Sequence, residues 1–154
     1  MSFYLLIISF VPPRASRTNR QPPHDRRLRI LLADDHAVIR KSVRQLLESY
    51  SRFEVCGEAR DGAEAVDEAQ RLKPDVVVLN ITMPVLDGIA AAREITARLP
   101  QTAIVILSSH ADKHFIEQAK KSGAQAYVAK SKAGEALVRA IEAAVVDGDF
   151  VLIE

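Results

Sequence analysis

Short apolar segments alternate with amphipathic segments between residues 28 and 146, and this alternation limits the folds open to the chain. The segments 75–79 (DVVVL) and 103–107 (AIVIL) are apolar at almost every position and rich in β-branched residues, which is typical of strands buried on both faces of a parallel sheet. Similar segments predict strands at 28–33, 53–59 and 126–129. Apolar residues at helical spacing predict helices at 36–48, 62–72, 89–99, 112–122 and 133–146.

Five strands that alternate with five helices predict an α/β domain, in which a doubly wound, five-stranded parallel sheet carries helices on both faces. A chain of 154 residues is long enough for one such domain with its own core. The single cysteine, Cys56, excludes an internal disulfide and a zinc site made of cysteines. A lone thiol is typical of a reducing compartment, so we expect a cytoplasmic protein.

The net charge of +1 conceals an uneven distribution. Residues 1–29 contain six arginines and one aspartate, which gives this segment a charge of +5, and residues 30–154 then hold 15 basic and 19 acidic residues, a charge of −4. Residues 12–29 also lack apolar periodicity. We therefore predict a basic, disordered extension over 1–27 and a folded domain over 28–154.

The first eleven residues (MSFYLLIISFV) form an apolar run that is too short to cross a bilayer. Positive charge follows this run instead of preceding it, unlike a signal peptide. We expect a loosely packed extension, or an upstream start codon that the cell does not use, and no membrane span; a membrane-surface anchor is the alternative.

Polar residues follow the predicted strands at the points where each strand ends. Asp34 and Asp35 follow the first strand, Asn80 the third, Ser108 the fourth and Lys130 the fifth. In doubly wound sheets the ligand site lies beyond the carboxyl ends of the strands. Two adjacent carboxylates favour a hard cation such as Mg²⁺, and a nearby ammonium and hydroxyl suit a phosphoryl group.

Each of these residues also has a structural alternative. Asp35 could cap the following helix, Lys130 could lie on the surface, and Ser108 could form a turn. A flavodoxin-like cofactor site is a further alternative, but the turn Ala33-Asp34-Asp35-His36 lacks the glycines and hydroxyls that cradle phosphate. Taken together, these polar residues favour a cation and phosphoryl site, because they follow several strands that end at the same edge of the predicted sheet.

Four motifs in order resemble the receiver domain of two-component response regulators. They are LLADDH (31–36), VVVLNITMPVLDG (76–88), IVILSS (104–109) and GAQAYVAKS (123–131). The resemblance covers about residues 28–153 and is greatest to receivers of the NarL/LuxR type. It implies a flavodoxin-like, receiver-type sheet and a role in phosphorelay signal transduction and transcription regulation.

The resemblance also implies roles for individual residues. Asp34, Asp35 and the backbone carbonyl of Thr82 would hold Mg²⁺, while Ser108 and Lys130 would contact a phosphoryl group. Ser108 and Tyr127 would form the switch, with the Tyr127 ring turned inward or outward. The implied partners are a sensor histidine kinase or another signalling protein, and a second copy bound through the face formed by the fourth helix, fifth strand and fifth helix.

Asn80 departs from the family, because it stands where receivers carry the aspartate that accepts the phosphoryl group. An amide nitrogen has a delocalised lone pair and an amide oxygen is uncharged, so neither can replace the nucleophilic carboxylate. We predict a non-enzymatic pseudo-receiver that acts by protein contact without phosphorylation and binds Mg²⁺ only weakly. The alternative is a phosphorylatable receiver, or its Asp-to-Asn variant, of a transcriptional response regulator; acceptance by a neighbouring carboxylate is a further option.

Two other departures concern the end of the fifth strand and the carboxyl-terminal end of the domain. Ser131 stands where many receivers carry a proline after the lysine, so the sequence allows a different loop geometry after the fifth strand. No helix-turn-helix pattern follows the last predicted helix, and we therefore expect no DNA-binding domain in this chain.

Overall fold

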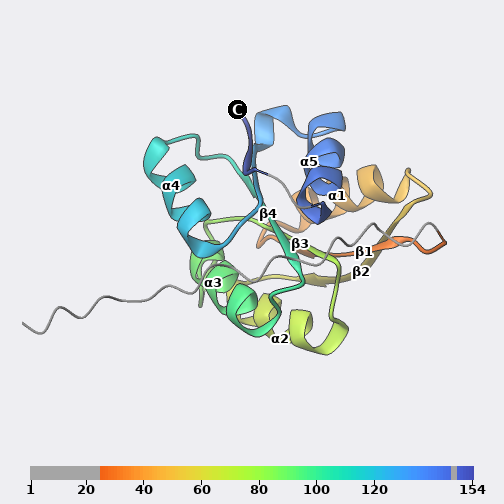
Figure 1. Cartoon of the computed structure of the whole chain (residues 1–154), viewed down its shortest axis with the longest axis horizontal. Helices are drawn as coiled ribbons and strands as arrows, with labels where there is room; N and C mark the ends of the chain where they lie inside the picture. The colour runs from red at the N-terminus through yellow and green to blue at the C-terminus, as the bar shows by residue number, and fades with distance from the viewer. Residues whose placement is uncertain (1–24, 147–148) are drawn as a thin grey trace, which may run out of the picture.

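The computed structural model describes residues 25–146 and 149–154 (Figure 1). The disorder predicted for the basic extension concerns residues that lie almost entirely outside the described part. Within residues 25–146 and 149–154, no helix has the length and apolar character needed to cross a membrane.

A six-stranded, all-parallel sheet forms the centre of the domain, with the strand order β2-β1-β3-β4-β5-β6. β3 and β4 are buried at every position, as their continuous apolar pattern predicts. The strands are β1 (Leu28–Ala33), β2 (Phe53–Ala59), β3 (Val76–Leu79), β4 (Ala103–Ser108), β5 (Ala126–Ala129) and β6 (Val151–Ile153). The strand order reverses between β1 and β3, so a ligand site is expected beyond the ends of these two strands.

Helices cover both faces of the sheet (Figure 1). One apolar core joins the sheet to α2, α3 and α4, and the other joins it to α1 and α5. The helices are α1 (Ala37–Glu48), α2 (Gly62–Leu72), α3 (Gly88–Arg98), α4 (Lys113–Ser122) and α5 (Glu135–Val145), with a short 3₁₀ turn, η1 (Lys130–Lys132), after β5. The doubly wound α/β architecture is confirmed, and η1 shows the loop geometry around Ser131.

The sixth strand was not predicted. Val151–Ile153 pairs in parallel with β5, and the Val151 N–H donates to the Gln125 carbonyl at 3.0 Å. Val151 and Ile153 pack on the α5 side of the sheet, while Phe150 packs on the other side. The pattern-based expectation failed because three apolar residues are too few to show a period.

Several helix ends differ from the sequence expectation by one or two residues. α1 begins after His36, which is its N-cap residue, so Asp35 does not cap this helix. α5 begins at Glu135 rather than 133, because residues 130–132 form η1 first. Gly123 ends α4 in the left-handed region with φ 98°, a conformation that favours glycine.

Arg26 and Asp75 connect the start of the described chain to the sheet. The Arg26 guanidinium donates two hydrogen bonds of 2.8 Å to the Asp75 carboxylate, and the Arg29 N–H donates a third at 2.8 Å. Burial acts to raise the pKa of Asp75, but these bonds and the arginine charges outweigh it and hold the pKa below its usual value.

Candidate functional site

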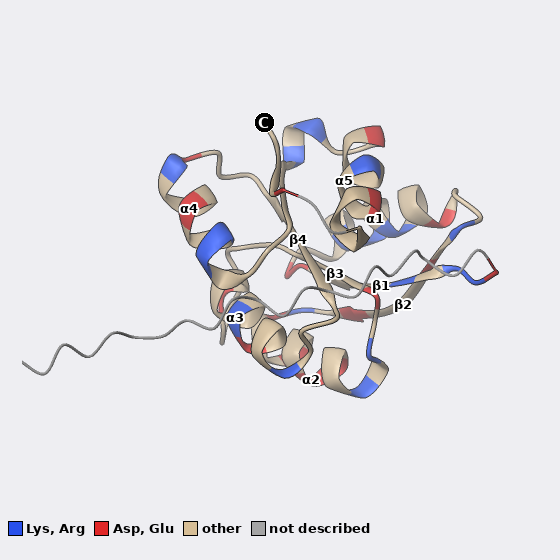
Figure 2. Cartoon of the chain, in the orientation of Figure 1, with Lys and Arg blue, Asp and Glu red and all other residues tan. Residues whose placement is uncertain are grey.

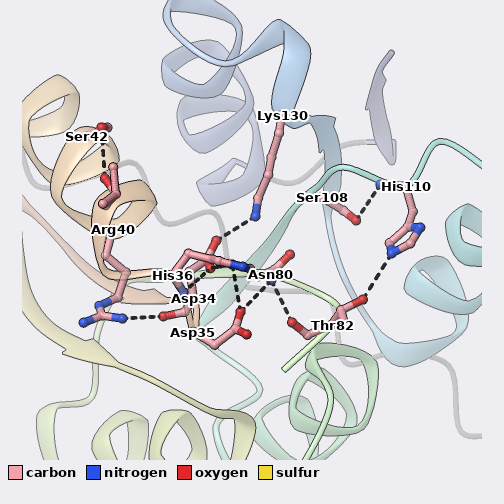
Figure 3. A network of polar contacts seen from close by, with 11 residues as sticks. Asp34, Asp35, His36, Arg40, Ser42, Asn80, Thr82, Ser108, His110 and Lys130 are labelled. Carbon is pink, nitrogen blue, oxygen red and sulfur yellow. Dashed lines mark hydrogen bonds and ion pairs between the residues drawn. The ribbon is translucent and has the colours of Figure 1, made fainter. Parts of the chain in front are cut away.

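Polar side chains from β1, β3 and β5 meet at the carboxyl edge of the sheet (Figure 3). Asp34 and Asp35 follow β1, Asn80 follows β3, and Lys130 follows β5. Parallel pairing brings these strand ends to the same edge, because Ala33 lies beside Leu79 and β4 connects β3 to β5. The structure therefore gathers four of the predicted site residues in one network.

Lys130 forms an ion pair with Asp34 inside this network. The Nζ atom of Lys130 donates to Oδ2 of Asp34 at 2.8 Å, and only 8% of the Asp34 side chain is exposed. Burial acts to raise the pKa of Asp34, yet the Lys130 ammonium and the hydrogen bonds from His36 outweigh it and lower the pKa. Asp34 is therefore held as a carboxylate by groups of the chain itself.

Asn80 donates hydrogen bonds to the oxygens that the receiver resemblance assigns to a metal. Its Nδ2 atom lies 2.9 Å from the Thr82 carbonyl oxygen and 3.3 Å from Oδ1 of Asp35. A carbonyl and a carboxylate only accept hydrogen bonds, so the two partners together orient the amide nitrogen toward them. Asn80 thus links the end of β3 to the end of β1 and to the loop after β3.

The backbone around Asn80 is tightly packed against the start of α3. The Gly88 N–H donates to the Ile81 carbonyl at 2.7 Å. A Cβ atom at Gly88 would lie only 1.9 Å from the Asn80 carbonyl oxygen. Glycine is therefore required at this position for the loop to close over Asn80.

Two basic residues join the acidic pair without having been predicted. The His36 N–H donates to Oδ1 of Asp34 at 2.9 Å, and its Nδ1 atom lies 3.2 Å from a carboxylate oxygen of both Asp34 and Asp35. Arg40 donates from Nη1 to the Asp34 backbone carbonyl at 2.7 Å. The adjacency of His36 to the acidic pair was the one sequence signal for its role.

Ser108 and Tyr127 belong to a neighbouring network centred on His110. The His110 N–H donates to Ser108 Oγ at 3.1 Å, the Tyr127 hydroxyl donates to the His110 carbonyl, and the His110 ring nitrogen Nε2 lies 3.1 Å from Thr82 Oγ1. Tyr127 is 1% exposed, so its ring points inward. Burial raises the pKa of Tyr127, although a hydrogen bond with Ser108 acts in the opposite direction.

His110 therefore connects the two networks, and sequence reasoning missed it. Its ring contacts the Thr82 hydroxyl, while the Thr82 carbonyl accepts the Asn80 amide (Figure 3). Its place two residues after Ser108, beyond the end of β4, was the available signal. Ser108 and Tyr127 reach the Asn80 network through His110 and Thr82.

Asp34, Asp35 and the Thr82 carbonyl offer the oxygen ligands that Mg²⁺ prefers. In this arrangement, however, the Asn80 amide nitrogen donates to the oxygens of Asp35 and Thr82, and Lys130 donates to Asp34. A cation that used these oxygens would compete with the N–H groups for their lone pairs. The residues as arranged therefore fit a divalent cation poorly.

Comparison with known proteins agrees with this fold and arrangement. The family model described as the response regulator receiver domain matches residues 30–142. The chain belongs to the response regulator receiver family. A receiver of this family is a module of two-component signalling, which confirms the resemblance found in the four motifs.

Relatives of this receiver include proteins named as transcriptional regulators. PdtaR of Mycobacterium tuberculosis, named as a transcriptional regulatory protein, is 40% identical over 117 residues, which are 76% of this chain and 56% of the relative. YhcZ of Bacillus subtilis, named as an uncharacterized transcriptional regulatory protein, is 38% identical over 112 residues, which are 73% and 52% of the two chains. The chain spans about half the length of the curated relatives it matches.

A solved structure shows the same relationship in three dimensions. The two-component response regulator of the LuxR family from Aurantimonas sp. SI85-9A1 has a TM-score of 0.76 and 36% identity, and the alignment covers 81% of this receiver and 89% of that chain. The flavodoxin-like receiver fold and the NarL/LuxR resemblance are confirmed by these comparisons.

Proposed function

We propose that this receiver is a pseudo-receiver, which signals by protein contact and does not need phosphorylation. The observation that carries the proposal is the Asn80 side chain, whose amide nitrogen is bonded to the Thr82 carbonyl and the Asp35 carboxylate. The receiver resemblance assigns the phosphoacceptor role to this position. An asparagine there offers no nucleophilic oxygen, because its carbonyl is uncharged.

Neighbouring carboxylates are poor substitutes for the acceptor. Asp34 is 5% exposed as a whole residue, and its carboxylate is paired with Lys130. Asp35 accepts from Asn80 and lies beside the His36 ring. We therefore propose no catalytic residue in this receiver, with Ser108 and Lys130 as remnants of a phosphoryl site and Ser108 and Tyr127 as switch residues held in one arrangement.

Magnesium binding should be weak on the same grounds. Asp34, Asp35 and the Thr82 carbonyl remain as candidate ligands, but replacing a carboxylate with Asn80 removes one negative charge from the set. Binding would also break the two hydrogen bonds of the amide. Magnesium is therefore not expected to control this module.

The proposed partners are a sensor histidine kinase or another signalling protein in the cytoplasm. A homodimer through the face of α4, β5 and α5 is a further proposal from the family resemblance. Such a contact would have to accommodate β6, because this strand pairs with the β5 edge.

A phosphorylatable receiver, or its Asp-to-Asn variant, in a transcriptional regulator is the second candidate. The joint retention of Asp34, Asp35 and Lys130 in one network favours it. The curated relatives are also named as transcriptional regulatory proteins. Under this alternative, the residue at position 80 is the one difference between this site and a site that accepts a phosphoryl group.

Intact mass measurement decides between the two candidates. The receiver and its Asn80→Asp variant are incubated with Mg²⁺ and acetyl phosphate, then weighed under conditions that preserve acyl phosphates. The proposal predicts no phosphoryl adduct on the natural sequence. An adduct on the natural sequence would overturn it, whereas an adduct on Asn80→Asp alone identifies residue 80 as the missing part of the site.

A further inference from the structure

A groove between α3 and α4 lies next to the candidate site. It has a volume of about 460 Å³, which is within the usual range of small-molecule sites, roughly 300 to 1,000 Å³. The loop after β3 contributes to the lining, since Thr82 lines the groove and its carbonyl accepts the Asn80 amide. The groove is therefore adjacent to the network that replaces the phosphoryl site.

Apolar side chains form much of the groove lining. Ile81, Met83 and Ile89 are 4%, 8% and 8% exposed, and the partly buried Phe115 faces them from α4. A groove of this kind favours a ligand with an apolar body, because binding removes apolar surface from water.

Arg93 supplies a positive charge at the groove wall. Its Nη2 atom donates to the neutral Gln118 Oε1 at 3.0 Å, which bridges α3 and α4. Among the residues the structure describes, no acidic side chain pairs with Arg93, whereas Arg98 on the same helix pairs with Glu94 at 3.4 Å. The guanidinium thus has donors available for an anion.

The charge of the two walls favours an anion as well. α4 carries Lys113, Lys120 and Lys121 against one glutamate, a net charge of +2, so blue marks both ends of this helix in Figure 2. α3 carries Arg93 and Arg98 against one glutamate, a net charge of +1. These charges belong to the helices as a whole; within the groove lining, Arg93 is the basic side chain and Asp87 the acidic one.

Asp87 is the acidic residue of the lining, and its carboxylate is engaged at the start of α3. Its carboxylate accepts the Ala90 N–H at 2.8 Å as the N-cap of α3. Arg93 lies six positions after Asp87, which corresponds to about 9 Å along the helix axis. His114, on the α4 wall, adds a further polar group.

We propose that this groove binds a small organic carboxylate, with the carboxylate at Arg93 and the apolar body on Ile89 and Phe115. Thr82 couples this ligand to the site, because one residue both lines the groove and accepts the Asn80 amide. The coupling rests on the proposed function: in a receiver that is not phosphorylated, ligand occupancy of the groove takes over as the input signal.

Octanoate is a suitable probe, with octylamine as the probe of opposite charge and equal chain length. In a titration followed by amide NMR on the ¹⁵N-labelled chain, octanoate should produce saturable shifts in residues 81–83, 89–93 and 114–118. Octylamine should produce none there. Equal shifts with octylamine, or octanoate shifts spread over the surface, would overturn the proposal.

Arg93→Gln and Arg98→Gln form the matched pair of variants. Loss of a charge-assisted contact should weaken octanoate binding by about tenfold or more in Arg93→Gln, and Arg98→Gln should stay within about twofold of the natural sequence. Equal binding by both variants contradicts the assignment of Arg93. Both arginines are exposed on α3, so each variant retains the apolar face that folds the helix.

The Asn80 side-chain amide signals report the coupling in the same titration. They should shift with the same saturation as the groove residues, and unmoved signals at saturation would overturn the coupling. Failure here is distinguishable from failure of the proposed function. A phosphoryl adduct on the natural sequence refutes the pseudo-receiver in the mass measurement, and octanoate binding is scored without reference to it.

Discussion

Lys130 and Asp34 are 96 positions apart in the sequence, and their side chains meet at 2.8 Å. The contact joins the end of β5 to the end of β1, although β3 and β4 lie between these strands in the sheet. Because 19% of the Lys130 side chain and 8% of the Asp34 side chain are exposed, the pair is largely shielded from water. A largely buried pair of this kind is strongly coupled to stability when one partner is removed.

Replacing Lys130 with methionine should therefore lower the free energy of unfolding by about 2–4 kcal/mol at pH 7. The deficit should narrow below about pH 4, because Asp34 stabilises the natural fold only while it is ionised. Urea denaturation across this pH range measures both effects. Lys132→Met, at an exposed position in the same 3₁₀ turn, is the control and should change stability by less than about 0.5 kcal/mol. A Lys130 variant as stable as this control would show that the pair contributes little.

The Asn80→Asp variant should acquire a dependence on Mg²⁺ that the natural sequence lacks. Aspartate removes the amide donor and places a third carboxylate near Asp34 and Asp35, so the variant should be less stable without metal. Mg²⁺ at one hundred times its dissociation constant should restore about 2.7 kcal/mol. Thermal unfolding with and without Mg²⁺ checks this, with Ca²⁺-free buffer and EDTA as the metal-free reference. A clear Mg²⁺-induced rise in the melting temperature of the natural sequence would contradict the weak Mg²⁺ binding inferred from the Asn80 hydrogen bonds.

Gly88→Ala should displace the backbone of the loop after β3, which carries Asn80. The added methyl group would lie 1.9 Å from the Asn80 carbonyl oxygen and 3.0 Å from the Ile81 Cα atom, so the backbone must move. We expect a loss of about 3 kcal/mol in chemical denaturation and a displaced Asn80 side-chain amide signal in NMR. Ala90→Ser, in the first turn of the same helix, is expected to leave both readings nearly unchanged. Normal stability of Gly88→Ala would mean that the loop is looser than this packing indicates.

The Arg26–Asp75 pair should make stability depend on pH in the acidic range. The folded pKa of Asp75 is lowered, so its contribution is complete above the unfolded pKa of about 3.9 and is lost as the pH falls through the folded value. Half of the Arg26 side chain is exposed, and solvent screening limits the contribution to less than about 1 kcal/mol. Arg26→Gln should therefore be slightly less stable at pH 7 and indistinguishable from the natural sequence near pH 2. Urea titrations of this variant and of Arg27→Gln provide the test, and identical curves for the two variants at pH 7 would refute it.

The sequence predicted the central strands and the edge at which the site lies, because both depend on local pattern. The runs at 75–79 and 103–107 are typical of buried strands of a parallel sheet. The strand-end rule then selected Asp34, Asp35, Asn80, Ser108 and Lys130. β6 escaped because its identity as a strand depends on pairing with β5, which a three-residue run does not reveal.

The contacts of the histidines were also beyond prediction. His36 and His110 lack a spacing that marks a metal site, and their roles arise from where the loops after β1 and β4 place their rings. The direction in which the Asn80 amide nitrogen points could not be predicted from the sequence either. Its two acceptors, Asp35 and the Thr82 carbonyl, come together only after β1 and β3 have paired.

The position of β6 also determines what the outer edge of the sheet presents to other chains. Without it, the backbone groups on the outer side of β5 would form an open sheet edge, which invites pairing with other chains. β6 closes that edge with only three residues, and the exposed residues Asp149 and Glu154 lie on either side of the apolar segment. A new strand approaching β6 would therefore meet a short template between two negative charges, which disfavours edge-to-edge aggregation.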